Sequence, residues 1–411
     1  MKILQVNCVY NNGSTGKIVA DIHTELKSKG IESVVCYGRG IKVTEPNVYK
    51  TCGELYSKFN NILSRLTGSM YGGCFFSTNK LISIIKKEKP DVVHLQCING
   101  YFVNVYRLVQ WLKENRIKTV LTLHAEFIHT ANCGHAFECE KWKTGCGHCP
   151  RLRAETKSLF FDGTARSWKK MKRAFDGFEE DLIVTSVSPW LMERAKQSPI
   201  LSNMRHAVVM NGLDTDIFKC YEASELKKEL GIKDEKIVFH ATAHFNDDPE
   251  HIKGGYYVLK LAKMMENENV RFFVAGVHPD GLEVPKNVTL LGSVKDQNRL
   301  AQLYSMADAT VLTSKKETFS MVTAESLCCG TPIVGFKAGA PEGIAIPEYS
   351  EFVEHGDVDA LRASLDKCLS KSYDKQNVSK VAISKYSKSV MVESYSNIYL
   401  AVIEGVNNEN N

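Results

Sequence analysis

The sequence predicts an α/β protein built from two Rossmann-like parallel-sheet domains that face one another across a cleft. Its 411 residues are too many for one ordinary hydrophobic core. Short β-branched apolar runs alternate with longer helical stretches, which is typical of parallel strands covered on both faces by helices. The same rhythm starts again after Asp214, so the chain divides into two halves.

In the first half, six short apolar runs are predicted to be strands. A loop rich in Gly, Ser and Asn follows the first of them, and a helix is predicted from about Gly16 to Lys29. The six runs are Ile3–Cys8, Val34–Tyr37, Val92–Gln96, Val120–His124, Ile183–Val187 and Ala207–Met210.

The second half repeats the pattern, and the segment 211–235 is predicted to connect the halves. A helix is expected over Gly255–Asn267, and a last helix over 386–403 with Tyr395, Ile398 and Tyr399 on one face. The polar tail 407–411 is predicted to fray. The predicted strands are Ile237–Ala241, Phe272–Ala275, Val288–Leu291, Thr310–Thr313 and Ile333–Phe336.

The composition points to a protein of the cytoplasm that meets phosphates or an anionic membrane surface. The chain has 52 Lys+Arg against 47 Asp+Glu, a net charge of +5, which argues against a dedicated nucleic-acid partner. No segment has the pattern of a signal peptide or of a spanning helix. Nine of the 13 cysteines lie among apolar neighbours, as buried thiols of a reducing compartment do.

The loop after the first predicted strand can bind an anion. Its residues 11–17 read N-N-G-S-T-G-K, and glycines before a helix N-terminus let the backbone approach a phosphate. Asn11 and Ile18 stand where a P-loop needs Gly and a hydroxyl residue, which excludes that nucleotide site. A tight turn with a helix cap explains the segment equally well.

A pair of carboxylates gives the sharper signal. Glu317 and Glu325 lie eight residues apart, with a helix expected to start near Phe319. Two carboxylates can bind the vicinal hydroxyls of a sugar and a ribose, and the helix N-terminus between them can hold a diphosphate. Lys253, after the first strand of the second half, can neutralise a leaving diphosphate. The alternative interpretation is that Glu317 caps the helix, Glu325 is a solvated helix residue and Lys253 is a surface lysine at a turn.

These motifs resemble glycosyltransferase family 4, whose members adopt the GT-B fold. The pair Glu317 and Glu325, followed by C-G-T-P-I-V at 329–334, is the specific part of the resemblance. The segment 94–102 and the Cys-rich loop resemble the branch that builds capsule and colanic-acid polysaccharide. The weaker matching pieces are Gly13–Gly16, His124, 211–214, 253–254, 291–292, 307–308 and 339–342.

The resemblance implies an N-terminal acceptor-side domain over 1–205, with a Cys-rich loop at 125–165. It also implies a nucleotide-sugar domain over 206–384 and a C-terminal helix, 385–411, that returns to the first domain. The reaction would be a hexosyl transfer from a UDP- or GDP-sugar to a glycan or lipid-linked acceptor. That transfer would retain the anomeric configuration and need no catalytic metal, so the two D-x-D pairs, at 214–216 and 357–359, are interpreted as structural.

The resemblance also assigns roles to residues. Glu317 would contact the donor sugar, Glu325 the ribose, and Lys253 the diphosphate. The residues that would face the phosphates, close over the donor or approach the transferred sugar are Thr318, Phe319, Ser320, Gly13, Ser14 and His124. The family usually has an Arg five residues before the Lys, and this chain has none; His244 or Asn246 would replace its charge or hydrogen bonds.

Four clustered cysteines predict a second kind of site. Cys133, Cys139, Cys146 and Cys149 lie within 17 residues, and the last two form a C-x₂-C knuckle. Four soft ligands at this spacing can hold a structural zinc ion, with free thiols or a disulfide as the alternatives.

The basic run Lys169–Arg173 lies on a predicted helix and could dock on anionic lipid, although such runs are commonly solvated faces. This would place the protein peripherally on the inner face of the membrane. Two other functions fit the sequence: a sugar-nucleotide 2-epimerase on the same fold, and a degenerate protein that binds a sugar nucleotide without turnover.

Overall fold

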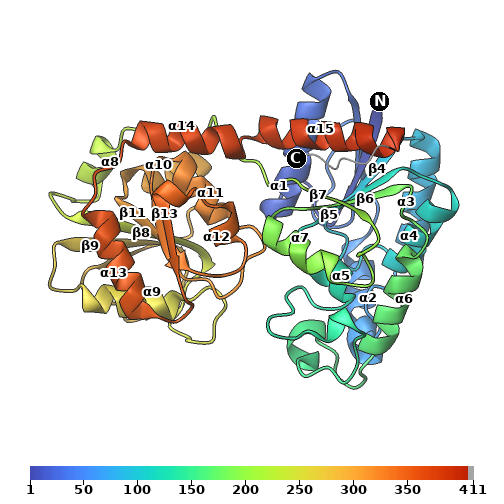
Figure 1. Ribbon diagram of the computed structural model, residues 1–411, viewed down its shortest axis with the longest axis horizontal. Coiled ribbons are helices and arrows are strands. Elements are labelled where there is room, and N and C mark those ends of the chain that lie inside the picture. Colours follow the sequence, from blue (N-terminus) through green and yellow to red (C-terminus); the bar gives the residue numbers. More distant parts are fainter. Residues whose placement is uncertain (406–411) are drawn as a thin grey trace. The chain divides into compact units, whose positions relative to one another are not determined.

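The computed structural model describes residues 1–405, which form two units (Figure 1). The first unit comprises Met1–Met210 together with the C-terminal segment from Met391, and the second comprises Asn211–Val390. Each unit is described by itself. The predicted frayed tail, 407–411, lies outside the described residues.

A seven-stranded sheet forms the centre of the first unit, with the strand order β3-β2-β1-β4-β5-β6-β7. All pairs are parallel, and β1 pairs with both β2 and β4, so the strand order reverses beside β1. The edge strand β3 has only three residues, too few for its apolar pattern to be recognised in the sequence. The strands are β1 (Lys2–Asn7), β2 (Glu32–Tyr37), β3 (Val48–Lys50), β4 (Val92–Leu95), β5 (Thr119–Leu123), β6 (Leu182–Ser186) and β7 (Arg205–Val208).

Within the described residues, eight α-helices belong to this unit. The first begins at Gly13, not near Gly16 as predicted, because the chain completes its turn early through left-handed backbone at Asn11 (φ 50°) and Gly13 (φ 63°). The helices are α1 (Gly13–Ser28), α2 (Glu54–Thr67), α3 (Phe75–Glu88), α4 (Val105–Glu114), α5 (Phe127–Thr130), α6 (Thr164–Phe175), α7 (Pro189–Lys196) and α15 (Lys388–Glu404), whose first three residues are assigned to the second unit.

Helix α15 packs its apolar face into the core of the first unit. Tyr395, Ile398 and Tyr399 are buried there, as their spacing predicts. A polar network fixes the helix: His94 on β4 contacts the Tyr399 hydroxyl at 2.9 Å and Thr122 at 2.7 Å, and Thr122 contacts the Tyr395 hydroxyl at 3.0 Å. A buried network of this kind fixes one position of the helix because every misalignment would leave polar groups unpaired.

The second unit contains a six-stranded parallel sheet in the order β10-β9-β8-β11-β12-β13. Counted from its own first strand, this is the order 3-2-1-4-5-6 of a dinucleotide-binding fold, with its switch point between β8 and β11. The strands are β8 (Lys236–His244), β9 (Val270–Val277), β10 (Val288–Gly292), β11 (Ala309–Leu312), β12 (Ile333–Phe336) and β13 (Ser350–Val353). The helices are α8 (Ser224–Glu229), α9 (Gly255–Met264), α10 (Gln297–Met306), α11 (Met321–Cys328), α12 (Pro341–Ile344), α13 (Val358–Leu369) and α14 (Lys375–Tyr386).

Two Rossmann-like parallel sheets confirm the predicted fold class. In parallel sheets of this order, ligands bind beyond the carboxyl ends of the strands at the switch point. The loops after β1 and β4 in the first unit, and after β8 and β11 in the second, are therefore the places to look for a site. Across residues 1–405, no helix is both long and apolar enough to cross a membrane.

Candidate functional site

An ion pair occupies the switch point of the second unit. The Lys253 ammonium lies 2.7 Å from Oε1 of Glu317, and both side chains are partly exposed. Lys253 follows β8 and Glu317 follows β11, two neighbouring strands. The structure thus brings together two residues that are 64 positions apart in the sequence.

Gly254 places Lys253 against the end of β11. Its backbone is left-handed, at φ +67°, and a Cβ there would lie 2.1 Å from the carbonyl oxygen of Thr313. The Thr313 hydroxyl also donates to the Lys253 carbonyl at 3.2 Å. Only glycine tolerates both the left-handed backbone and the close contact with Thr313. The close approach of the two loops therefore fixes the backbone position of Lys253.

Replacing this glycine should be costly. We expect Gly254→Ala to lower the free energy of unfolding by about 3 kcal/mol, because a left-handed backbone and a backbone clash both oppose the methyl group. Gly231→Ala is a matched control, since Gly231 has φ +66° and open space around its Cβ; its cost should be about 1 kcal/mol. Urea unfolding of both variants measures the difference, and equal losses would contradict the role given to the clash.

The Glu317 backbone is held by the loop after β12. Its N–H donates to the Ala338 carbonyl at 2.9 Å, and the residue forms a parallel bridge with Gly339. The Glu342 carboxylate accepts from the N–H groups of Ala338 and Gly339 at 3.1 and 3.0 Å. Glu342 therefore holds the loop that positions Glu317, a role that the sequence did not reveal.

The segment between the two glutamates forms a strained turn into α11. Phe319 is buried, and Ser320 adopts φ +82°, which is rare for a residue with a side chain. The Ser320 hydroxyl accepts from the Thr323 N–H at 3.3 Å and so caps the helix. Strain of this kind persists only where its surroundings hold it, and it is frequent at ligand sites. Thr318, which directly precedes Phe319, is half-buried.

Glu325, on α11, has a buried partner. The Tyr304 hydroxyl donates to its Oε2 at 3.0 Å, and Tyr304 is fully buried on α10. Burial, and then the neighbouring carboxylate, hold the pKa of Tyr304 well above its usual value, so the phenol stays a donor. A polar partner for Glu325 was expected, but the sequence did not identify it as Tyr304, 21 positions away.

His244 and Asn246, the predicted substitutes for the missing Arg, lie at and just after the end of β8. The His244 side chain is exposed, and the Asn246 carboxamide accepts from the Asp248 N–H at 3.2 Å. A third residue of β8 was not predicted as part of the site: His240 is buried and donates from Nδ1 to the Val311 carbonyl at 2.9 Å. Burial lowers the pKa of His240 to about 4, with a smaller contribution from the nearby Lys253 charge.

In the first unit, His124 follows β5 and is buried. Its Nε2 donates to Gln96 Oε1 at 3.1 Å, and the Gln96 amide donates to Gln5 at 2.7 Å. This chain of amides fixes the proton on Nε2. Burial lowers the pKa of His124 to about 4, so the imidazole is neutral at physiological pH.

Gly13 and Ser14 are exposed in the first turn of α1. The prediction placed them in a loop before the helix, and in this respect it was wrong. Their N–H groups are among those that a helix start leaves without intrahelical acceptors, so the turn can still bind an anion.

Comparison with known proteins identifies the second unit. Residues 222–385 match the family model Glycosyl transferases group 1. The chain carries a group 1 glycosyltransferase domain. The family resemblance seen in the sequence is thereby confirmed, and the match supports glycosyl transfer as the chemistry.

Two curated relatives align with this chain over more than four fifths of their length. N-acetyl-alpha-D-glucosaminyl L-malate synthase of Bacillus anthracis is 24% identical over 372 residues, covering 87% of this chain and 82% of the relative. The putative colanic acid biosynthesis glycosyl transferase WcaC of Escherichia coli K12 is 22% identical over 364 residues, covering 83% and 84%.

Solved structures share the fold. The sucrose-phosphate synthase of Thermosynechococcus elongatus superposes with a TM-score of 0.68 at 14% identity, covering 99% of this chain and 100% of that chain. Anabaena Alr3699/HepE, solved in complex with UDP-glucose, superposes with a TM-score of 0.63 at 15% identity, covering 98% and 100%.

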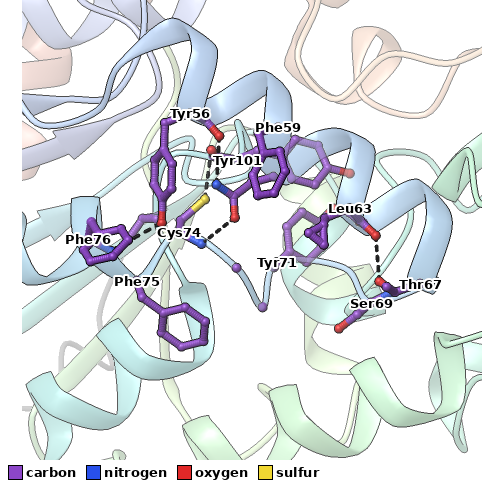
Figure 2. Close-up of a pocket in the computed structure, with 15 residues that line it drawn as sticks. Tyr56, Phe59, Leu63, Thr67, Ser69, Tyr71, Cys74, Phe75, Phe76 and Tyr101 are labelled. Carbon is purple, nitrogen blue, oxygen red and sulfur yellow. Dashed lines mark hydrogen bonds between the residues drawn. The ribbon is translucent and has the colours of Figure 1, made fainter.

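The first unit also contains an apolar cavity, which the sequence did not predict. It has a volume of about 370 Å³ and lies between α2 and α3 (Figure 2). Aromatic side chains line much of it, among them Tyr56, Phe59, Phe76 and Tyr101. None of the predicted site residues does so.

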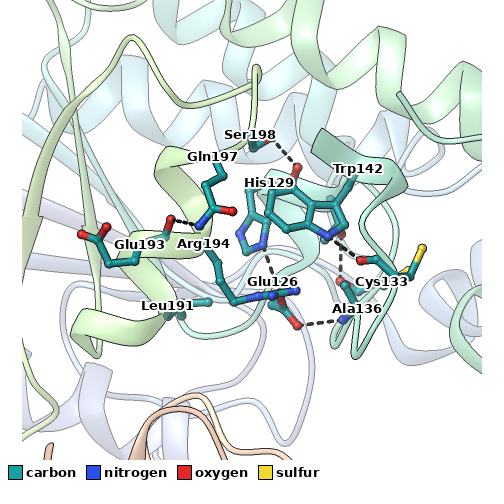
Figure 3. A network of polar contacts seen from close by, with 12 residues as sticks. Glu126, His129, Cys133, Ala136, Trp142, Leu191, Glu193, Arg194, Gln197 and Ser198 are labelled. Atoms are coloured by element: carbon teal, nitrogen blue, oxygen red, sulfur yellow. Dashed lines mark hydrogen bonds and ion pairs between the residues drawn. The ribbon is translucent and has the colours of Figure 1, made fainter. Parts of the chain in front are cut away.

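A buried charge network lies directly after His124. Glu126 is fully buried, and its Oε1 pairs with Arg194 Nε on α7 at 2.5 Å and with His129 at 3.4 Å (Figure 3). Its other oxygen accepts from the Ala136 N–H at 2.7 Å. Although burial alone would raise it, these partners lower the pKa of Glu126 to about 2. The Arg194 guanidinium lies 5.1 Å from the ring of Trp142, so the network ties the Cys-rich loop to α7.

The four cysteines of that loop line one small cavity. Burial and the three neighbouring thiols raise the pKa of Cys133, and burial raises that of Cys146 to about 11. Over the described chain, no group of three or more Cys, His, Asp or Glu side chains is arranged to hold a metal ion. Structural zinc at this cluster therefore stays a prediction.

The buried histidines make stability depend on pH. Burial lowers the pKa of His94 to about 3 and the pKa values of His124 and His240 to about 4 each, from 6.5. Below pH 6.5 the unfolded chain binds protons that the folded chain does not, so stability must fall as pH falls. We expect a loss of roughly 1.4 kcal/mol per pH unit for each histidine between pH 6 and pH 4. Urea unfolding at pH 7, 6 and 5 measures the slope; a flat profile would contradict it.

Proposed function

We propose that the chain transfers a sugar from a UDP- or GDP-sugar to a glycan or lipid-linked acceptor in surface polysaccharide biosynthesis. The observation that supports this best is the Lys253–Glu317 pair at the switch point of a group 1 glycosyltransferase domain. A cation and a carboxylate at one point suit a ligand that carries both phosphates and hydroxyls. A nucleotide sugar is such a ligand.

In the donor complex, the Lys253 ammonium leaves Glu317 and forms an ion pair with the diphosphate. The released Glu317 carboxylate then accepts hydrogen bonds from the sugar hydroxyls. Glu325, held by Tyr304, binds the ribose. The N–H groups at Thr318–Ser320 and the start of α11 face the phosphates, where the helix dipole favours negative charge.

The reaction breaks the bond between the anomeric carbon and the diphosphate oxygen. Negative charge grows on the diphosphate, and Lys253 and the α11 N-terminus stabilise it. The acceptor hydroxyl attacks from the face of the leaving group and gives its proton to a phosphate oxygen, so the configuration is retained without a metal. His124, being neutral, serves as a hydrogen-bond partner for the transferred sugar.

The relatives favour two acceptor classes. A putative colanic acid glycosyltransferase and a protein of the Klebsiella pneumoniae cps region, 23% identical over 355 residues, support a polysaccharide acceptor. The Bacillus anthracis relative is named N-acetyl-alpha-D-glucosaminyl L-malate synthase, which adds L-malate, a small hydroxy acid, to the acceptors worth testing.

A panel of nucleotide sugars tests the proposal. We expect one UDP- or GDP-sugar to raise the melting temperature, and that donor to yield a glycoside with retained configuration when a lipid-linked glycan or L-malate is added. The protein should remain active after chelation with EDTA. An epimerised nucleotide sugar formed without acceptor would overturn transfer in favour of isomerisation. Binding without turnover by any acceptor would indicate a binding protein.

A further inference from the structure

Exposed apolar side chains gather on one part of the first unit. Of the nineteen large apolar residues that are exposed within residues 1–405, ten lie in three segments, 55–66, 75–76 and 159–161. They form what we call the apolar surface: Leu55, Phe59, Ile62, Leu63, Leu66, Phe75, Phe76, Leu159, Phe160 and Phe161. Apolar groups concentrated in this way mark an interaction site more often than scattered ones do.

Helix α2 exposes apolar side chains and buries two serines. Leu55, Phe59 and Ile62 repeat at helical spacing and point outward, with exposures of 83%, 58% and 55%. Its buried residues are Ser57 and Ser64. An ordinary surface helix buries its apolar stripe and exposes its serines, so the arrangement favours an apolar partner outside the domain.

The three segments are physically continuous. The Cys74 N–H, at the start of α3, donates to Asn60 of α2 at 2.8 Å, and the rings of Tyr56 and Phe76 lie 6.0 Å apart. At the other end of α2, the Leu159 N–H donates to the Arg65 carbonyl at 2.8 Å. The apolar cavity of Figure 2 opens within this surface, lined by Phe59, Leu63, Phe75 and Phe76 among others.

Positive charge lies next to the apolar surface. Helix α6 carries five bases, Arg166, Lys169, Lys170, Lys172 and Arg173, and no acid. All five are exposed. Phe75 lines both the apolar cavity and a polar one that contains Arg107, Lys170 and Arg173. The basic helix and the apolar surface are therefore adjacent.

We propose that this surface docks on a bilayer of anionic lipid. The apolar side chains enter the boundary between headgroups and acyl chains, and the bases of α6 rest on the headgroups. A protein partner would supply apolar contacts, but the exposed bases of α6, a helix without acids, suit a negatively charged lipid surface. The proposal rests on the proposed function only for its lipid-linked acceptor, which a bilayer would hold. The apolar residues that carry it are not part of the donor site.

Vesicle flotation tests it with the full chain and no sugar nucleotide. The chain should float with vesicles of phosphatidylethanolamine and phosphatidylglycerol, and should bind phosphatidylcholine vesicles at least about tenfold more weakly. The variant Phe160→Ser/Phe161→Ser should weaken binding about a hundredfold, since two rings leave the lipid. Lys169→Gln/Lys170→Gln should weaken it about tenfold and reduce its salt dependence.

Matched variants keep the result interpretable. Met264→Ser/Val277→Ser removes two apolar side chains of the second unit with exposures of 40% and 49%, and should leave flotation unchanged. Leu55→Ser/Phe76→Ser tests the apolar surface at a second place, should the first variant fold poorly. Donor-induced melting shifts should be intact in all of them, so failure of the donor site and failure of docking are separable. Unchanged flotation of both apolar-surface variants would overturn the proposal. The proposal would also be overturned if the unaltered chain formed a dimer instead of binding vesicles and these variants abolished the dimer.

Discussion

Lys253→Ala should reduce kcat/KM for sugar transfer by about 10²–10³ while the protein stays folded. The structure places this ammonium 2.7 Å from the Glu317 carboxylate, at the switch point of the second unit. Its removal leaves the diphosphate charge to the backbone N–H groups of α11. Steady-state kinetics with the donor found in the panel measure the loss, and a melting curve checks the fold.

Two further variants sharpen this result. Lys315→Ala removes an exposed lysine of the neighbouring loop that pairs with Glu250 at 3.7 Å, and should change kcat/KM little. Lys253→Arg keeps the charge and should recover part of the activity. Near-normal transfer by Lys253→Ala would remove the assignment of this residue to the diphosphate.

Glu126→Ala should destabilise the first unit by about 3–5 kcal/mol, because it leaves the Arg194 guanidinium buried without its counter-charge. The carboxylate itself is fully buried, and Arg194 is largely so. Trp142 and Trp190 both lie against Arg194, at 5.1 and 5.2 Å, so tryptophan fluorescence reports on this network directly. Urea unfolding followed by that signal gives the change in free energy.

The control for Glu126 lies on the same helix as its partner. Glu193 on α7 is exposed and pairs with Lys196 at 3.0 Å, so Glu193→Ala should change stability by less than about 0.5 kcal/mol. Glu126→Gln keeps the hydrogen bonds but not the charge. Its loss of stability should fall between those of Glu126→Ala and Glu193→Ala. A loss for Glu126→Ala no larger than that of Glu193→Ala would refute the role given to the buried pair.

Much of the fold could be read from local patterns. The longer strands, such as β1 and β8, consist of near-continuous apolar runs, which only a sheet covered on both faces requires. The short edge strands β3 and β13 were not predicted, because three or four partly buried residues show no recognisable alternation of apolar and polar side chains. The start of α1 was misplaced since it depends on left-handed backbone at Asn11, which composition does not reveal.

The site was predictable only in part, for a different physical reason. Lys253, Glu317 and Glu325 occupy loop and helix-start positions that a sequence pattern can mark. Their supports are distant in the chain: Tyr304 reaches Glu325 from another helix, and Glu342 acts by holding the backbone beside Glu317. Such partners are defined by how strands and helices are stacked, so they become visible only in three dimensions.

The docking of α15 has a consequence for synthesis of the chain. The core of the first unit includes Tyr395 and Tyr399, which bond to Thr122 and His94, yet the ribosome makes them after the whole of the second unit. The nascent N-terminal half therefore lacks part of its core until the second unit has been synthesised. A chain truncated before α15 would leave that core incomplete.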